Sequence, residues 1–345
     1  MKKKTNAFFL EKIKHKLKLK ERITLPELSK GQVLVKLIYT SLCGSQIMEI
    51  NGKRGKDSYL PHGLGHEGVA KVITLGPGVR RLKKGDKVIL TWIKSKGHDC
   101  KGYKLNIGNK KYLNFGPITT LSNYSIISEN RCVRKPKNLN DKLAAFFGCS
   151  ISTGFGIVYN SINKKNRNKS IGIYGLGTVG VFSLLAAKCL NFKKIFVIEK
   201  NKSKLNLAKK LGAIIINYKK PLSDLKTINQ NKLLDYCFES TGKAEAIETS
   251  INLINNNGIC YISSHPNNKD KIKISPYELI KGKKIIGSWG GYTKPDKDFI
   301  NYSKLLNKNF KLIKLIKIKT YKFKEINKAI NDLQNNKIIK PLIKC

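Results

Sequence analysis

The chain has 345 residues, 41% of them hydrophobic, so it is long enough for two domains with buried cores and is not a disordered chain. Its 68 basic residues outnumber its 22 acidic residues, for a net charge of +46. The excess is almost all lysine, spread from end to end without a nucleic-acid-binding motif, so charge alone does not indicate specific nucleic-acid binding.

The N-terminal stretch MKKKTNAFFLEKIKHK has a short apolar patch that ends at Glu11 and Lys12, so it does not resemble a secretory signal. No apolar run approaches the length needed to span a membrane. We therefore expect a cytoplasmic protein without a membrane partner. The eight cysteines are scattered along the chain, which predicts free thiols or metal ligands rather than a disulfide framework.

Three kinds of sequence pattern follow one another along the chain. Residues 22–150 are rich in β-branched runs broken by glycine and proline, which predicts an irregular β region. Residues 151–288 alternate short apolar runs with helical segments, which predicts a doubly wound parallel sheet. The pattern changes again over residues 289–345, which end in an amphipathic segment, FKEINKAINDLQNN.

A glycine-rich turn between a strand and a helix predicts a dinucleotide site. The sequence IGIYGLGTVG places Gly175 in the tight turn, Gly177 where backbone approaches a pyrophosphate, and Gly180 where the helix packs on the strand. The backbone N–H groups at Thr178 and Val179 begin that helix and are expected to bind the diphosphate.

The next apolar run ends at Glu199, where an acidic residue usually accepts the hydroxyl groups of the adenosine ribose. Its carboxylate would repel a 2′-phosphate, so NAD is predicted over NADP. Lys200, Lys202 and Lys204 crowd the same region and leave NADP as the alternative.

Three segments carry residues typical of metal sites: Cys43 in CGSQ, His66 in GLGHEG and Cys149 in FFGCS. They lie far apart in the sequence, so spacing alone does not define a site. A buried cysteine is ordinarily a small hydrophobic residue.

A series of short motifs occurs along the chain in this order: KGQVLVK, the Cys43 loop, LGHEGVAKV, GPGV, KKGDKVI, the Cys149 segment, GLGTVG, LGA and FESTG. The order of these motifs resembles that of the zinc-dependent alcohol dehydrogenases of the medium-chain dehydrogenase/reductase family. The resemblance covers nearly the whole chain. It implies an α/β fold with a GroES-like irregular β catalytic domain over 1–150, a Rossmann NAD-binding domain over 151–288, and a return to the catalytic domain over 289–345.

The resemblance also implies site residues. Cys43, His66 and Cys149 would bind one catalytic zinc ion per chain, with Glu67 as a further possible ligand, and Ser45 would relay the alcohol proton. Further positions that match the family are Thr153 near the nicotinamide, Lys340 near the cofactor phosphate and Trp92 in the substrate pocket.

The chain also departs from the family at several positions. Gln46 replaces an aspartate that often orients the zinc-bound histidine, and Met48 stands where some members continue the proton relay with a histidine. Only Cys100 occupies the lobe that often carries four cysteines, so we expect no four-cysteine structural zinc.

The resemblance implies an oxidoreductase that transfers a hydride between an alcohol and NAD(H), with an aldehyde or ketone as product. A polyol or sugar-derivative dehydrogenase of the same fold is the enzyme alternative. A basic scaffold that binds nucleotides or nucleic acid is the non-enzyme alternative. The expected partners are a small alcohol or aldehyde and other copies of the chain, in a homodimer or homotetramer.

Overall fold

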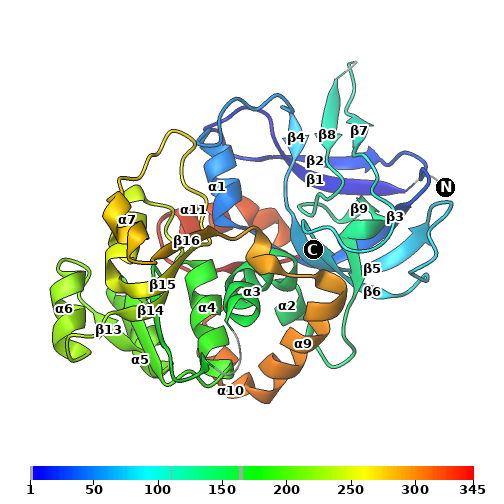
Figure 1. Cartoon of the computed structure of the whole chain (residues 1–345). Coiled ribbons are helices and arrows are strands. Elements are labelled where there is room, and N and C mark those ends of the chain that lie inside the picture. The colour runs from blue at the N-terminus through cyan, green and yellow to red at the C-terminus, as the bar shows by residue number, and fades with distance from the viewer. Residues whose placement is uncertain (1–2, 110, 163–165) are drawn as a thin grey trace. The chain divides into compact units, whose positions relative to one another are not determined.

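The computed structural model describes residues 3–109, 111–162 and 166–345, and the chain forms two compact units (Figure 1). The first unit comprises residues 1–149, 294–303 and 317–345, and the second comprises 150–293 and 304–316. The segment after residue 289 is therefore divided between the two units.

Among the described residues, the first unit contains a five-stranded and a seven-stranded sheet, both mostly antiparallel. The five-stranded sheet has the order β2 (Lys18–Thr24), β1 (Lys4–Leu10), β4 (His62–Gly63), β8 (Tyr112–Phe115) and β7 (Tyr103–Asn106). The larger sheet has the order β10 (Cys132–Arg134), β6 (Lys87–Thr91), β5 (Glu67–Leu75), β3 (Gln32–Ser41), β18 (Pro341–Lys344) and β17 (Lys319–Lys322), with β9 (Tyr124–Ser128) also paired to β3.

Strand β3 is apolar on both faces because each face covers a different core. Val33 and Val35 pack with Val72 and Leu90 from strands β5 and β6. Leu34, which points the other way, packs with residues of the five-stranded sheet such as Phe115. A continuous apolar run in the sequence therefore marks a strand between two cores.

Short helices complete the first unit: α1 (Gly44–Ile50), α2 (Asp141–Ala144) and α11 (Ile326–Gln334), with the 3-10 turns η1 (Glu129–Arg131) and η5 (Phe323–Glu325). Helices α1 and α11 share one core, to which they contribute Ile50 and Ile330. Helix α9 (Pro295–Lys308) begins in the first unit and ends in the second, and Phe147–Ile151 forms the π-helical turn η2 where the first unit ends.

The second unit is built on a parallel sheet, which Figure 1 colours from green to yellow-brown. Among the described residues its order is β13 (Ile214–Ile216), β12 (Lys194–Ile198), β11 (Ser170–Tyr174), β14 (Leu234–Glu239), β15 (Ile254–Ile262) and β16 (Lys284–Gly287). Every pairing between these strands is parallel. Numbered by position in the chain, this is the 3-2-1-4-5-6 order of dinucleotide-binding sheets.

The helices of this unit include α3 (Ser152–Ser161), α4 (Thr178–Cys189), α5 (Lys202–Lys210), α6 (Pro221–Ile228), α7 (Ala244–Leu253), α8 (Pro276–Ile280) and α10 (Phe310–Lys314), with the 3-10 turn η4 (Gly290–Tyr292). The predicted α/β fold is confirmed in both its irregular β part and its parallel sheet. Within the described ranges, no helix is both long and apolar enough to cross a membrane.

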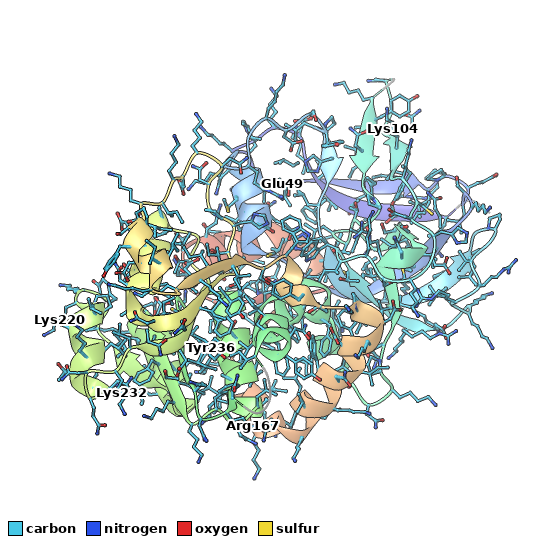
Figure 2. All side chains as sticks on the ribbon, viewed as in Figure 1. Glu49, Lys104, Arg167, Lys220, Lys232 and Tyr236 are labelled. Carbon is cyan, nitrogen blue, oxygen red and sulfur yellow. The ribbon has the colours of Figure 1, made fainter. Side chains whose placement is uncertain are left out.

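The positive charge lies mostly at the surface. Figure 2 labels several of these side chains, all exposed: Lys104, Arg167, Lys220 and Lys232. The excess lysine is therefore compatible with buried apolar cores in both units, because long lysine side chains reach solvent.

Candidate active site

Cys43, His66 and Cys149 come together in the first unit although the sequence separates them widely. Cys43 precedes α1, His66 precedes β5, and Cys149 lies in the π-helical turn. One ligand atom from each lies within 4.8 Å of the others, and the two sulfur atoms are 3.8 Å apart. The structure thus assembles the three side chains to which the family resemblance assigned zinc.

Two glycines allow the chain to form this cluster. A Cβ atom on Gly148 would lie 2.0 Å from the carbonyl oxygen of Leu90, so only glycine lets the Cys149 turn pack this closely on β6. Gly65, next to His66, has a φ of +98° and faces Thr120 so closely that a Cβ would lie 2.3 Å from its Oγ1. Larger residues at either position would displace a neighbouring cluster residue.

Hydroxyl groups hold the backbone on both sides of the cluster. Thr91 donates a hydrogen bond to the carbonyl oxygen of Gly148 at 2.8 Å. Thr40 and Thr120 place their hydroxyls 2.9 and 3.1 Å from the carbonyl oxygen of Glu67. All three threonines are fully buried, so these bonds fix the backbone beside His66 and Cys149.

The polar atoms of the cluster are arranged so that they could bind a cation. The Nε2 atom of His66 is buried and has no hydrogen-bond partner among the described residues. The Cys149 thiol donates to Cys43, and this hydrogen bond lowers the pKa of Cys43 well below its usual value and raises that of Cys149. A buried imidazole nitrogen without a partner is costly unless something binds it.

The donor set fits zinc. Two sulfur ligands on a tetrahedral zinc ion, each at about 2.3 Å, lie about 3.8 Å apart. The sulfur atoms of Cys43 and Cys149 have this separation. Two thiolates and one imidazole leave a fourth position open, as catalytic zinc sites require.

Behind the cluster, Lys340 forms a buried ion pair with Glu67, whose carboxylate accepts from its ammonium group. Lys340 is 1% exposed and Glu67 is fully buried. Burial by itself would lower the pKa of Lys340, but the charges of Glu67, Cys43 and Cys149 outweigh it and raise the pKa. The sequence suggested a cofactor phosphate for Lys340 and did not reveal this partner.

The other candidates of the first unit lie near α1 and β6. Ser45 is half-buried in the first turn of α1, two residues after Cys43. Gln46 accepts a hydrogen bond from the Cys43 backbone N–H at 3.0 Å, so its side-chain oxygen caps the helix. Trp92 is half-buried directly after β6, and its carbonyl oxygen accepts from Arg131.

In the second unit, the glycine-rich turn joins β11 to α4. Gly175 has a φ of +86°, and a Cβ on Gly180 would lie 1.9 Å from the Gly175 carbonyl oxygen. Apart from its chain neighbours, no atom of the described residues lies within 4 Å of the Cβ position at Gly177. Thr178 and Val179 are half-buried in the first turn of α4. The turn therefore leaves open backbone where a pyrophosphate is expected.

Glu199 directly follows β12, and its carboxylate faces the glycine-rich turn. Its Oε2 accepts from the Leu176 N–H at 2.7 Å, and its Oε1 accepts from the N–H groups of Lys200 and Asn201 at 2.8 and 2.9 Å. The side chain is held in place beside the glycines. Lys204 lies half-buried in α5, and Thr153 is 8% exposed in α3.

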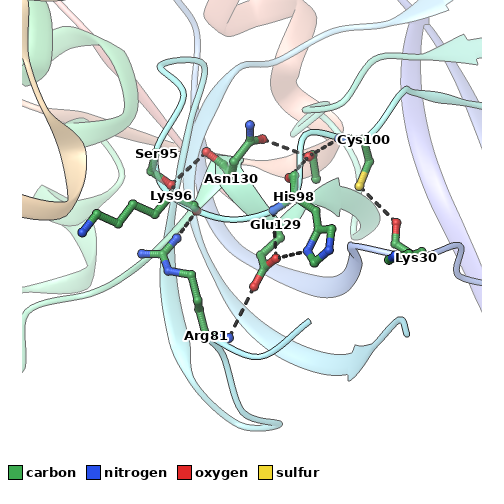
Figure 3. Close-up of polar contacts among 9 residues, drawn as sticks. Lys30, Arg81, Ser95, Lys96, His98, Cys100, Glu129 and Asn130 are labelled. Carbon is green, nitrogen blue, oxygen red and sulfur yellow. Dashed lines mark hydrogen bonds and ion pairs between the residues drawn. The ribbon is translucent and has the colours of Figure 1, made fainter. Parts of the chain in front are cut away.

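The lobe with the single Cys100 is organised by Glu129 (Figure 3). The carboxylate of Glu129 is 2% exposed and accepts from the N–H and Nδ1 of His98 at 2.9 and 2.7 Å, and from the Arg81 N–H at 3.3 Å. Cys100 instead directs its thiol to the Lys30 carbonyl oxygen at 3.2 Å. A buried carboxylate thus fixes this loop.

Comparison with known families matches both units. Residues 29–137 match the alcohol dehydrogenase GroES-like domain, and residues 178–308 match the zinc-binding dehydrogenase domain. The chain belongs to the zinc-dependent alcohol dehydrogenase family. It is an alcohol oxidoreductase, as the sequence resemblance implied.

Known alcohol dehydrogenases are similar to this chain over most of its length. The chain is 28% identical over 338 residues to alcohol dehydrogenase 6 of Peromyscus maniculatus, spanning 90% of this chain and 89% of that protein. It is 28% identical over 345 residues to alcohol dehydrogenase 1 of Solanum tuberosum, with the same coverage of 90% and 89%. The structure of benzyl alcohol dehydrogenase from Acinetobacter calcoaceticus matches with a TM-score of 0.87 and 26% identity, over 99% of each chain.

Proposed function

We propose that this alcohol dehydrogenase holds one catalytic zinc ion with Cys43, His66 and Cys149 and oxidises a small alcohol to an aldehyde or ketone with NAD. The observation that carries the proposal is the three-residue cluster, whose sulfur separation of 3.8 Å suits tetrahedral zinc. When bound, zinc supplies a Lewis acid that favours the ionised alcohol.

The chain's own groups prepare the ligands. Cys43 is the sulfur that ionises first, because the Cys149 thiol donates to it and lowers its pKa. The buried positive charge of Lys340 opposes the accumulation of negative charge from two thiolates and Glu67. Glu67 is assigned to this ion pair in our proposal, rather than to direct metal binding.

Ser45 is the proposed first acceptor of the alcohol proton. It follows Cys43 by two residues in the first turn of α1 and is half-buried, so it is close in the chain to a proposed zinc ligand and is not sealed in the core. A hydroxyl can accept one proton as it donates its own, which is the property that a relay requires. Trp92 is the proposed apolar wall for the substrate.

The proposed cofactor site uses the glycine-rich turn and Glu199. The open backbone at Gly177 and the N–H groups of Thr178 and Val179 would hold the diphosphate, with Gly175 and Gly180 shaping the turn. The ordered Glu199 carboxylate would accept ribose hydroxyls and repel a 2′-phosphate, which favours NAD. Lys204 and Thr153 would contact the cofactor from α5 and α3, whereas we assign Lys340, which is 1% exposed, to the ion pair with Glu67.

The decisive experiment is a substrate panel of primary, aromatic and polyol alcohols with NAD and NADP, run beside zinc analysis. We expect one zinc per chain and alcohol-dependent reduction of NAD. Activity confined to polyols would identify the sugar-derivative alternative. Full activity in protein that lacks zinc would contradict the proposed site.

We also propose that the enzyme forms a homodimer or homotetramer. Strand β16 is an edge of the parallel sheet, and α8 beside it in the sequence exposes Tyr277, Leu279 and Ile280 by 63%, 47% and 79%. Exposed apolar residues near a free sheet edge favour association. Light scattering of the purified protein measures the state, and a monomer at micromolar concentration would contradict the proposal.

A further inference from the structure

A second group of titratable side chains lies in the first unit, outside the Cys43 cluster. His62 is 7% exposed, and its Nε2 lies 2.8 Å from Asp57 Oδ2 and 3.7 Å from Glu49 Oε1. Its Nδ1 lies 3.0 Å from the carbonyl oxygen of Gly63. Only 22 acidic residues occur in this basic chain, and two of them converge on one buried histidine.

The distances favour proton transfer over metal binding at this group. Nitrogen and oxygen ligands bound at about 2.0–2.2 Å to one tetrahedral metal ion lie more than about 3 Å apart. The 2.8 Å between His62 and Asp57 is instead a direct hydrogen bond. Since a carbonyl oxygen only accepts, Nδ1 carries a proton, and the hydrogen bond between Nε2 and the Asp57 carboxylate requires a second proton between those two atoms, which is the one that can be passed on.

Glu49 connects this group to the active site along α1, where Figure 2 labels it. Ser45 and Glu49 are four residues apart in the helix Gly44–Ile50, so both side chains lie on one face, one turn apart. Both are half-buried. Met48, which stands where some relatives place a relay histidine, has no group that can carry a proton.

We propose that Glu49, His62 and Asp57 form the route by which the proton released from the alcohol reaches solvent. The proposal rests on alcohol oxidation as proposed above. It assigns to Glu49 the acceptor task that Met48 cannot perform.

This proton transfer needs no further reactant. The hydroxyl proton of the alcohol would pass by way of Ser45 to the carboxylate of Glu49, while a bound nicotinamide would supply the hydride acceptor. The proton held between His62 Nε2 and Asp57 passes to Asp57, which is 13% exposed and releases it to water, and Glu49, whose Oε1 lies 3.7 Å from Nε2, then gives its proton to the vacated Nε2. All three groups then return to their starting states, and one proton has left for each alcohol oxidised.

The other charged groups near this route do not interrupt it. Arg54 lies 3.8 Å from Glu49, and the Tyr59 N–H donates to Asp57 at 3.0 Å. Helix α11, which shares a core with α1, brings Ile330 and Ala329, and its Asp332 is bonded to Lys319 and Tyr321 instead. In β1, the strand that pairs with His62, the following Glu11 is bonded to Lys18.

Glu49→Gln tests the route, because it keeps the shape and hydrogen bonding of the side chain but cannot take a proton. In the zinc-loaded enzyme we expect kcat for alcohol oxidation to fall about ten- to a hundredfold with little change in KM, and the solvent deuterium isotope effect to increase. Added imidazole buffer should restore the rate in proportion to its concentration. Glu27→Gln makes the same change at an exposed glutamate outside the route and should change neither value.

The double variant Met48→His with Glu49→Gln separates proton transfer from a structural role. A histidine at position 48 offers another acceptor on α1, so it should recover at least part of the lost kcat. Failure of both the buffer and Met48→His to restore a reduced rate would show that Glu49 acts structurally, and would overturn the route. Unchanged kcat and isotope effect in Glu49→Gln would also overturn it.

A readout without turnover completes the test. The ¹⁵N resonances of His62 in substrate-free protein should show a protonated Nδ1 and an Nε2 that responds to Asp57→Asn. If the Nε2 resonance is the same in the Asp57→Asn variant as in the wild type, the route is overturned regardless of the kinetic results. If the wild-type enzyme oxidises no alcohol with either cofactor, the proposed function fails and the route with it, whereas an active enzyme with an unaffected Glu49→Gln variant refutes the route alone.

Discussion

Lys340 and Glu67 form an ion pair in the interior of the first unit, next to the Cys43, His66 and Cys149 cluster. Glu67 belongs to the same strand that begins after His66, and Lys340 directly precedes the C-terminal strand β18. The pair therefore ties the end of the chain to the zinc-binding segment across 273 positions of sequence.

Lys340→Met should strongly destabilise the enzyme, because it leaves Glu67 buried without its counter-charge. Breaking a buried pair in this way costs about 3–5 kcal/mol of unfolding free energy. Combining Lys340→Met with Glu67→Gln should recover most of that loss. Urea unfolding measures each value, with Lys324→Met, whose side chain is 80% exposed, as the control. Equal stability of the single variant and the wild type would mean that the ion pair is dispensable.

Cys43→Ala should reduce the zinc content from one ion per chain to none and abolish activity, because two remaining ligands do not hold a catalytic zinc ion firmly. The fold of the second unit should persist, since it has its own parallel sheet and core. Metal analysis and circular dichroism measure the two outcomes. Cys100→Ala is the matched control and should keep its zinc. Two zinc ions per wild-type chain would contradict the single site.

Much of this architecture was predictable because its signals are local. The apolar strand before Gly175 and the glycines after it predict a strand, a turn and a helix, and the structure contains β11 and α4 there. The motif order predicted the family and the α/β fold, and both are confirmed. The Cys43, His66 and Cys149 cluster came from resemblance, because neither spacing nor periodicity brings such distant residues together.

The partners of buried charges were not predictable in the same way. Lys340 sits in a lysine-rich segment, so its sequence neighbours do not distinguish it from exposed lysines. Only the pairing of β18 with β3, next to β5, brings it to Glu67. His62 was likewise invisible as a partner of Glu49, because the contact depends on the fold of residues 51–61 between α1 and β4.

Ser45→Ala should lower turnover about a hundredfold or more, the usual scale for loss of a positioned proton-transfer group. Cofactor affinity should change far less, because the glycine-rich turn is untouched. Single-turnover hydride transfer measured across pH is the appropriate assay. Ser45→Thr keeps a hydroxyl and should retain most of the rate. An alanine variant with the wild-type rate and pH dependence would remove Ser45 from the relay.

Glu199→Ser should raise the use of NADP relative to NAD. The substitution removes a carboxylate that would repel a 2′-phosphate, while Lys200, Lys202 and Lys204 remain to attract it. Steady-state kinetics with both cofactors gives the ratio of kcat/KM values. Glu199→Asp keeps the charge and should keep the preference for NAD. An unchanged ratio in the serine variant would show that the carboxylate does not face the ribose.

Glu129→Gln should make the free energy of unfolding of the first unit vary less with pH in the acid range. Burial alone would raise the pKa of Glu129, but hydrogen bonds from His98 and from the Arg81 backbone outweigh burial and lower the pKa. The folded state therefore favours the charged form. This contribution to stability is fully present above the unfolded pKa of about 4.3, and it is lost as pH falls through the lower pKa of the folded state.

At neutral pH the glutamine variant should lose about 1.5–3 kcal/mol of unfolding free energy, the range for a hydrogen bond to a charged group. The difference from wild type should shrink as pH falls below about 4, because the wild-type carboxylate is then protonated as well. Urea unfolding at several pH values measures both effects, with Glu27→Gln as the exposed control. A constant difference at every pH would mean that Glu129 stabilises the lobe by its shape and packing, because only an ionised carboxylate gives a contribution that acid removes.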